Sequence, residues 1–173
     1  MVTNAIDTGN AKLTYAKARQ LSAKRYTATK NIYKNLLQAG IIWHWKSPWS
    51  SPVHLADKGE DNLRACGDYR ALNALTKPDR YPIPHMSSVS LKLDGMRYYS
   101  KVYLLKADHQ IKMSEDIEKT TVATPFGLFE YVYMPFGLWN ATATFQRFMD
   151  NIMNTKCVFI YLDDILIYSE DKE

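Results

Sequence analysis

The segment of residues 157–168 constrains the fold most strongly, because in it two apolar runs flank a pair of adjacent aspartates, Asp163 and Asp164. Both runs are rich in β-branched and aromatic residues, which favour strands, and aspartate tolerates the geometry of a tight turn. The segment therefore predicts a β-hairpin with both carboxylates at its tip. Adjacent carboxylates repel one another, and a bound cation relieves that repulsion. Their hard oxygen atoms select Mg²⁺ or Mn²⁺, while an ordinary solvated Asp-Asp turn is the alternative that the spacing leaves open.

Length and composition indicate one globular domain, because the chain has 173 residues, of which 46% are hydrophobic. Lys and Arg number 22 against 18 Asp and Glu, which gives a formal charge of +4. This excess permits a nucleic-acid partner without requiring one, because a count cannot show a basic patch. The longest apolar stretch is interrupted by the two aspartates, and no apolar leader opens the chain, so we expect neither a membrane span nor a signal peptide.

Hydrophobic periodicity and turn residues predict a mixture of helices and strands without regular βαβ alternation, which favours an α+β fold. Residues 1–21 are polar and are expected to form an extended or poorly ordered lead-in. Helices are expected at residues 23–38, 85–93 and 140–153. Strands are expected at residues 53–56, 63–69, 98–105, 120–124 and 128–133 and on both sides of the paired aspartates.

The motif Tyr161-Leu162-Asp163-Asp164 inside its apolar run resembles the polymerase motif of reverse transcriptases. Other segments resemble that family in the same order along the chain, and the closest likeness is to gypsy-type LTR retrotransposons. These segments are residues 6–12, 40–53, 64–73, 79–84, 124–131, 134–138 and 143–150. Agreement over so many ordered blocks identifies the chain as a member of this family.

The resemblance implies a fingers-and-palm fold, in which helices back an antiparallel palm sheet. The fingers are expected at roughly residues 22–75 and 112–138, and the palm at roughly residues 76–111 and 139–173. The thumb and RNase H parts of a Pol polyprotein are expected to be absent from this chain. The resemblance also implies the partners: an RNA or DNA template with its primer, and deoxynucleoside triphosphates.

The implied activity is RNA-directed DNA polymerisation by two metal ions, Mg²⁺ or Mn²⁺. The family holds these ions with the hairpin pair, here Asp163 and Asp164, and with an aspartate on an earlier palm strand. Arg64 matches the residue that reaches the triphosphate, although an exposed fingers charge is the alternative. Phe136 and Gln146 match the floor of the nucleotide pocket and the helix behind it. For Phe136, packing in the core is an equally good interpretation.

The earlier palm strand departs from the family pattern. His109, Gln110 and Ile111 fix the register, so that Tyr103 stands where the metal-binding aspartate belongs. Asp108 stands where the family has the aromatic that checks the sugar 2′ position. A neutral phenol is a poor Mg²⁺ ligand at neutral pH, so we expect an inactive or severely impaired enzyme. On a continuing strand Asp108 would face away from position 103, because the separation is odd, whereas a bend at Ala107 would bring it near the nucleotide.

Two other interpretations stay open. One is a working polymerase in which Asp108 or Mn²⁺ compensates for Tyr103. The other is a non-catalytic nucleic-acid-binding or scaffold module derived from a retroelement. Trp49, Tyr131 and Tyr133 are separate candidates for base stacking, with packing in the core as the alternative. Lys58 is expected to be a solvated loop lysine. The expected location is the cytoplasm, with entry into the nucleus as the alternative.

Overall fold

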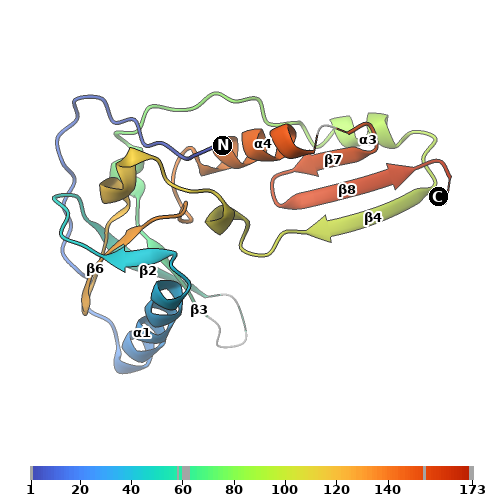
Figure 1. Ribbon diagram of the computed structural model, residues 1–173. Helices are drawn as coiled ribbons and strands as arrows, with labels where there is room; N and C mark the ends of the chain where they lie inside the picture. The colour runs from blue at the N-terminus through green and yellow to red at the C-terminus, as the bar shows by residue number, and fades with distance from the viewer. Residues whose placement is uncertain (1, 58, 60–62, 154, 172–173) are drawn as a thin grey trace.

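Two β-sheets organise the chain, and a long strand-and-helix arm extends from the part that contains α1 (Figure 1). The computed structural model describes residues 2–57, 59, 63–153 and 155–171. Lys58, predicted to lie in a solvated loop, is outside the described residues. The α+β fold with an antiparallel palm sheet is confirmed, whereas the boundaries of fingers and palm stay a prediction. In the described part of the chain, helices are too short or too polar to cross a membrane.

The larger sheet has the strand order β1-β6-β5-β2-β3. Its strands are β1 (Ile42–His44), β6 (Gly127–Tyr131), β5 (Val122–Thr124), β2 (Ser51–Asp57) and β3 (Leu63–Gly67). Helix α1 (Ala23–Gln38) packs on this sheet and has the bounds that the sequence predicts. Its buried Tyr33 packs against Phe126 and Phe129, with ring centroids 5.7 and 4.9 Å away. These aromatic contacts anchor the helix to the sheet.

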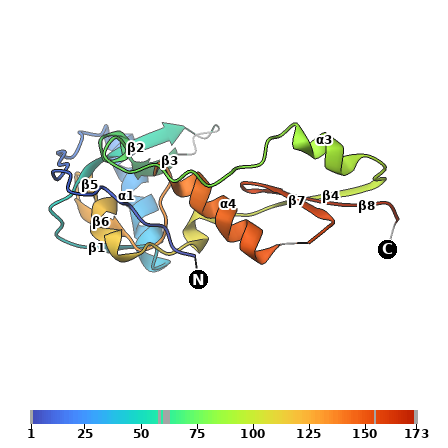
Figure 2. The ribbon, with the colours of Figure 1, turned by 90° about the horizontal axis from the view of Figure 1, so that it is seen from above.

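The smaller sheet has the order β4-β8-β7 and is antiparallel throughout. Strands β7 (Val158–Tyr161) and β8 (Asp164–Ser169) form the predicted hairpin, and β4 (Tyr98–Tyr103) is exposed at every position. Helix α4 (Ala141–Ile152) packs next to β7. Figure 2 shows α3 (Ser88–Leu93) and α4 beside this sheet. The hairpin aspartates therefore rest on a supported pair of strands.

Several short elements depart from the sequence-based expectations. The strand expected at residues 98–105 ends at Tyr103, because Lys106 takes a left-handed conformation with φ 53° and the 3₁₀ helix η1 (Ala107–Gln110) follows. The helix expected at residues 85–93 begins only at Ser88. Strand β1, the short helix α2 (Arg70–Asn73) and the 3₁₀ helix η2 (Glu115–Thr120) were not predicted. All of these are short, so local periodicity carries little signal for them.

The lead-in is extended, and it is packed rather than peripheral. Asn4, Ile6 and Thr8 are buried. Asn4 Oδ1 accepts a hydrogen bond of 3.0 Å from the Thr144 hydroxyl on α4. The backbone of Asn4 also pairs with Met113. Polar composition hid this contribution to the core, because alternate residues of an extended segment can face inward.

Gly67 in β3 gives a first prediction, since a Cβ added there would lie 2.4 Å from Cζ of Tyr69. The Tyr69 ring is buried, and its hydroxyl donates a hydrogen bond of 2.7 Å to the Thr120 carbonyl. We expect Gly67→Ala to lower the free energy of unfolding by about 2–3 kcal/mol, measured by urea denaturation. The control His54→Ala changes an exposed side chain on neighbouring β2. A loss as small as that of the control would contradict this account of the packing.

Candidate active site

The tip of the hairpin is held from behind by Gln146 of α4, which is fully buried. Its Oε1 accepts a hydrogen bond from the Leu162 backbone N–H at 3.1 Å. Its Nε2 donates to the Ile160 carbonyl at 3.3 Å and to Asp150 Oδ1 at 3.0 Å. Leu162 sits in the left-handed region with φ 54°, which costs free energy for a residue with a side chain. Gln146 thus fixes the turn that carries Asp163, whereas its expected part in nucleotide binding stays a prediction.

Tyr103 lies next to the tip of the hairpin, on the neighbouring strand β4, where its register partner in β8 is Asp164. The phenol is 63% exposed. Lys101 Nζ lies 3.4 Å from Asp164 Oδ2 and 4.5 Å from the centroid of the Tyr103 ring. Hydrogen bonding to Tyr103 and the charge of Asp164 both raise the pKa of Lys101. The carboxylate of Asp164 therefore faces a phenol and an ammonium group.

A cavity of about 480 Å³ opens beside Asp163. Arg64, Asp108, Phe136 and Asp163 all line it, so the structure brings four of the predicted site residues together. The Arg64 guanidinium lies 4.4 Å from the centroid of the Phe136 ring. The remaining lining residues are Asn73, Gly137, Leu138, Trp139, Ala141, Thr142, Phe145 and Leu162. Gln146 and Asp164 are not among them.

Asp108 reaches this cavity because η1 redirects the chain after Tyr103. Asp108 would face away only on a continuing strand, and the strand ends at Tyr103, so the alternative of a bend near Ala107 is the one that the structure has. Burial, followed by the charge of Asp163, raises the pKa of Asp108 to about 6, while Arg64 opposes the rise. Burial and the charge of Asp164 also raise the pKa of Asp163, again opposed by Arg64. Two carboxylates therefore compete for one guanidinium.

This competition predicts that Asp108 destabilises the folded chain at neutral pH. Its folded-state pKa lies above the ordinary value of 3.8, so the folded state binds the proton more tightly and stability rises as pH falls from about 6 towards 4. We expect Asp108→Asn to stabilise the chain by about 1–2 kcal/mol at pH 7, with little gain near pH 4. Urea denaturation at both pH values measures this. Asp57→Asn, at an exposed position, is the control, and an equal gain in both variants would contradict the assignment.

The family resemblance implies a two-ion centre, and the structure shows which side chains surround its predicted ligands. Within the described residues, no group of three or more His, Cys, Asp or Glu side chains could hold a metal ion. Asp164 is paired with Lys101, and Tyr103 is its register partner in β4. Asp108 and Asp163 share the cavity with Arg64. Asp163 and Asp164 stay the predicted ligands of an ion.

Sequence reasoning missed two residues that shape the site. Asn73 Nδ2 donates to the Gly137 carbonyl at 2.8 Å, and its Oδ1 accepts from the Trp139 N–H at 2.9 Å, so Asn73 fixes the turn at the rim of the cavity. Its place in a segment that matches the family was the available signal. Lys101 is the other, and its alternation with Tyr103 along β4 placed both on one face of the sheet.

The chain was also compared with known proteins. A family model described as reverse transcriptase (RNA-dependent DNA polymerase) matches residues 56–173. The chain is 39% identical over 178 residues to the retrovirus-related Pol polyprotein from transposon 297 of Drosophila melanogaster, which covers 97% of this chain and 17% of the relative. It is 34% identical over 181 residues to that of transposon gypsy of the same organism, with 99% and 18% covered. The chain thus spans less than a fifth of these curated relatives' length.

Solved structures agree on the fold. The foamy viral protease-reverse transcriptase in complex with an RNA/DNA hybrid has a TM-score of 0.87 at 20% identity, and covers 98% of this chain and 23% of that one. The same viral protein in complex with dsDNA has a TM-score of 0.81 at 19% identity, with 98% and 34% covered. At such identities the likeness establishes the fold alone. The family match over most of the chain, together with the Drosophila relatives, shows that the chain belongs to the reverse transcriptase family, among the Pol sequences of gypsy-type retrotransposons.

Proposed function

We propose that the chain is the fingers-and-palm part of an RNA-directed DNA polymerase whose nucleotidyl transfer is lost or severely reduced. The observation that carries this proposal is the register of β4 and β8, which sets Tyr103 opposite Asp164. The family resemblance gives position 103 to a metal-binding aspartate. If losing that ligand removes about 4 kcal/mol of transition-state stabilisation, the rate falls roughly 10³-fold.

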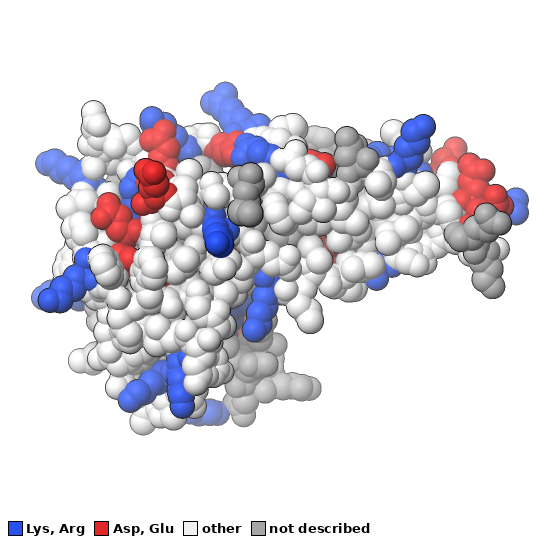
Figure 3. Space-filling view, in the orientation of Figure 1, with Lys and Arg blue, Asp and Glu red and all other residues white. Residues whose placement is uncertain are grey.

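The expected substrates are a primer-template and a deoxynucleoside triphosphate. Arg64 and Phe136 would contact the nucleotide. A guanidinium can donate hydrogen bonds to phosphate oxygens, and the Phe136 ring packs against the guanidinium of Arg64. The cavity is nevertheless poorly matched to an anion, because Asp108 and Asp163 outnumber Arg64. Figure 3 shows Lys and Arg side chains scattered over the face seen in that view rather than gathered into one stripe. Nucleotide and duplex binding should therefore be weak and should fall steeply with salt.

Single-nucleotide incorporation on a primer-template tests the proposal. The chain is compared with a double variant, Asp163→Asn with Asp164→Asn, in Mg²⁺ and in Mn²⁺. We expect the two proteins to incorporate nucleotide at the same background rate, because the site lacks a required ligand before the hairpin is altered. A rate in the unaltered chain that is 10²-fold or more above the double variant would contradict the proposal.

A second candidate function is a working polymerase in which Asp108 supplies the missing carboxylate. The observation that favours it is the shared cavity of Asp108 and Asp163. Incorporation by the unaltered chain that is abolished by Asp108→Asn, and kept by Tyr103→Phe, would support this candidate over the first.

A further inference from the structure

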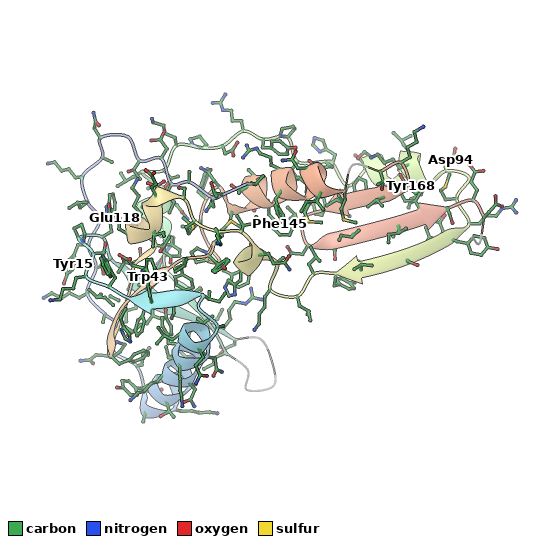
Figure 4. All side chains as sticks on the ribbon, viewed as in Figure 1. Tyr15, Trp43, Asp94, Glu118, Phe145 and Tyr168 are labelled. Atoms are coloured by element: carbon green, nitrogen blue, oxygen red, sulfur yellow. The ribbon has the colours of Figure 1, made fainter. Side chains whose placement is uncertain are left out.

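Two exposed tryptophans lie at the outer edge of the larger sheet, away from the cavity beside Asp163. Trp43 in β1 is 44% exposed and Trp45, just beyond it, is 61% exposed. Their ring centroids are 6.2 Å apart, with the ring planes tilted by 37°. In the described part of the sheet, β1 pairs with β6 alone and so forms one edge. Figure 4 labels Trp43 on this part of the molecule, far from Tyr168 on the smaller sheet.

Contacts within the fold account only in part for the position of Trp43, and they do not account for the exposure of Trp45. Trp43 Nε1 donates a hydrogen bond of 2.8 Å to Glu130 Oε2, which fixes the indole against the sheet. Trp45 borders a hollow of about 630 Å³ whose other lining residues are His44, Lys46 and Leu128. Large exposed apolar side chains gathered at one place usually mark a binding surface.

The charges around the hollow indicate an anionic partner. Its lining holds the cationic side chain of Lys46, together with His44, and no acidic residue. The neighbouring Glu130 is buried, and burial raises the pKa of its carboxyl, with a further contribution from the charge of Glu118. The Glu130 carboxyl group accepts hydrogen bonds from Trp43 Nε1 and from the Thr121 hydroxyl. Aromatic rings for base stacking beside cations for phosphates are what single-stranded nucleic acids require.

We propose that Trp43, Trp45 and Lys46 form a binding surface for single-stranded nucleic acid, separate from the polymerase cavity. Bases stack on the two indoles, and the Lys46 ammonium pairs with a phosphate of the same strand. His44 lines the same hollow, and its ring lies 4.3 Å from the Phe129 ring, centroid to centroid. The surface goes beyond the proposed polymerase function, because it needs neither metal ion nor nucleotide.

Fluorescence anisotropy of a labelled, unstructured oligonucleotide, as RNA and as DNA, tests this surface on the whole chain without divalent metal. We expect Trp45→Ala to weaken binding roughly 10-fold, while Trp45→Phe keeps most of the affinity, because a smaller ring still stacks. Lys46→Ala is expected to reduce the slope of log affinity against log salt by about 0.7. Tyr98→Ala, an exposed aromatic on the other sheet, should leave binding unchanged.

Three results would overturn the proposal. The first is no measurable binding of either oligonucleotide. The second is equal binding by the unaltered chain and Trp45→Ala, which would locate the strand elsewhere. The third is tryptophan fluorescence that the oligonucleotide leaves unchanged and a proline-rich peptide quenches, which would make the surface a peptide site.

Discussion

Tyr103→Asp is expected to create a divalent-metal site at the hairpin, with Mn²⁺ affinity about 100-fold or more above that of the unaltered chain. The new carboxylate would stand at the register partner of Asp164, with Asp163 next along the turn. An ionised carboxylate is a hard oxygen ligand that suits a divalent ion, whereas a tyrosine phenol is a poor one. Lys101 now pairs with Asp164 and would be displaced by the ion.

Titration calorimetry and thermal unfolding together measure this effect. In chelator the variant should unfold at a lower temperature than the unaltered chain, because like charges then face one another. Adding Mn²⁺ should restore its stability, since an ion that binds only the folded state stabilises it. Tyr103→Phe is the matched control and should bind no more tightly than the unaltered chain. Equal affinity in the aspartate and phenylalanine variants would remove Tyr103 from the explanation.

Gln146→Leu is expected to lower the free energy of unfolding by about 3 kcal/mol. The side chain is fully buried, and it satisfies the Leu162 N–H and the Ile160 carbonyl at the hairpin as well as Asp150. Leucine fills a similar volume but leaves those buried polar groups without their partner. The effect therefore reports hydrogen bonding more than packing.

Urea denaturation measures the loss, and Asn151→Ala, at an exposed position of the same helix, is the control with an expected change within about 0.5 kcal/mol. Amide hydrogen exchange supplies a local readout, since the Leu162 N–H should exchange faster in Gln146→Leu than in the unaltered chain. If the loss is below about 1 kcal/mol and exchange at Leu162 is unchanged, Gln146 does not hold the turn.

Local sequence patterns predict the elements that are long or strongly marked. Helix α1 has its predicted bounds, because apolar positions recur at helical spacing and Gly40 follows with φ 67°. The hairpin around Asp163 follows from two apolar strands and a turn. The parallel pairing of β2 with β5 could not be predicted, because the partners are far apart in sequence and tertiary contacts decide such pairings. Strand β1 has three residues, too few for a period to show.

The candidate site was predicted by resemblance for Arg64, Phe136 and Asp163, which line one cavity. Asp108 was also placed there by resemblance, but its direction could not be predicted, because it depends on whether the strand continues, and the left-handed turn at Lys106 ends the strand. Residue type could not separate exposed from buried aromatics. Trp49 and Tyr131, candidates for base stacking, are buried, whereas Trp45 is exposed and was not singled out. Burial depends on where a strand falls in its sheet, which the local pattern does not encode.

The central claim is that Tyr103 deprives this fold of a required metal ligand, and primer extension on an RNA template tests it most directly. The unaltered chain and Tyr103→Asp are each joined to the thumb segment of a related active polymerase and assayed in Mg²⁺ and in Mn²⁺. We expect only the Tyr103→Asp protein to extend the primer measurably, at a rate at least about 10³-fold higher than that of the unaltered protein. Equal extension by both proteins would contradict the account and would make this chain a working polymerase domain.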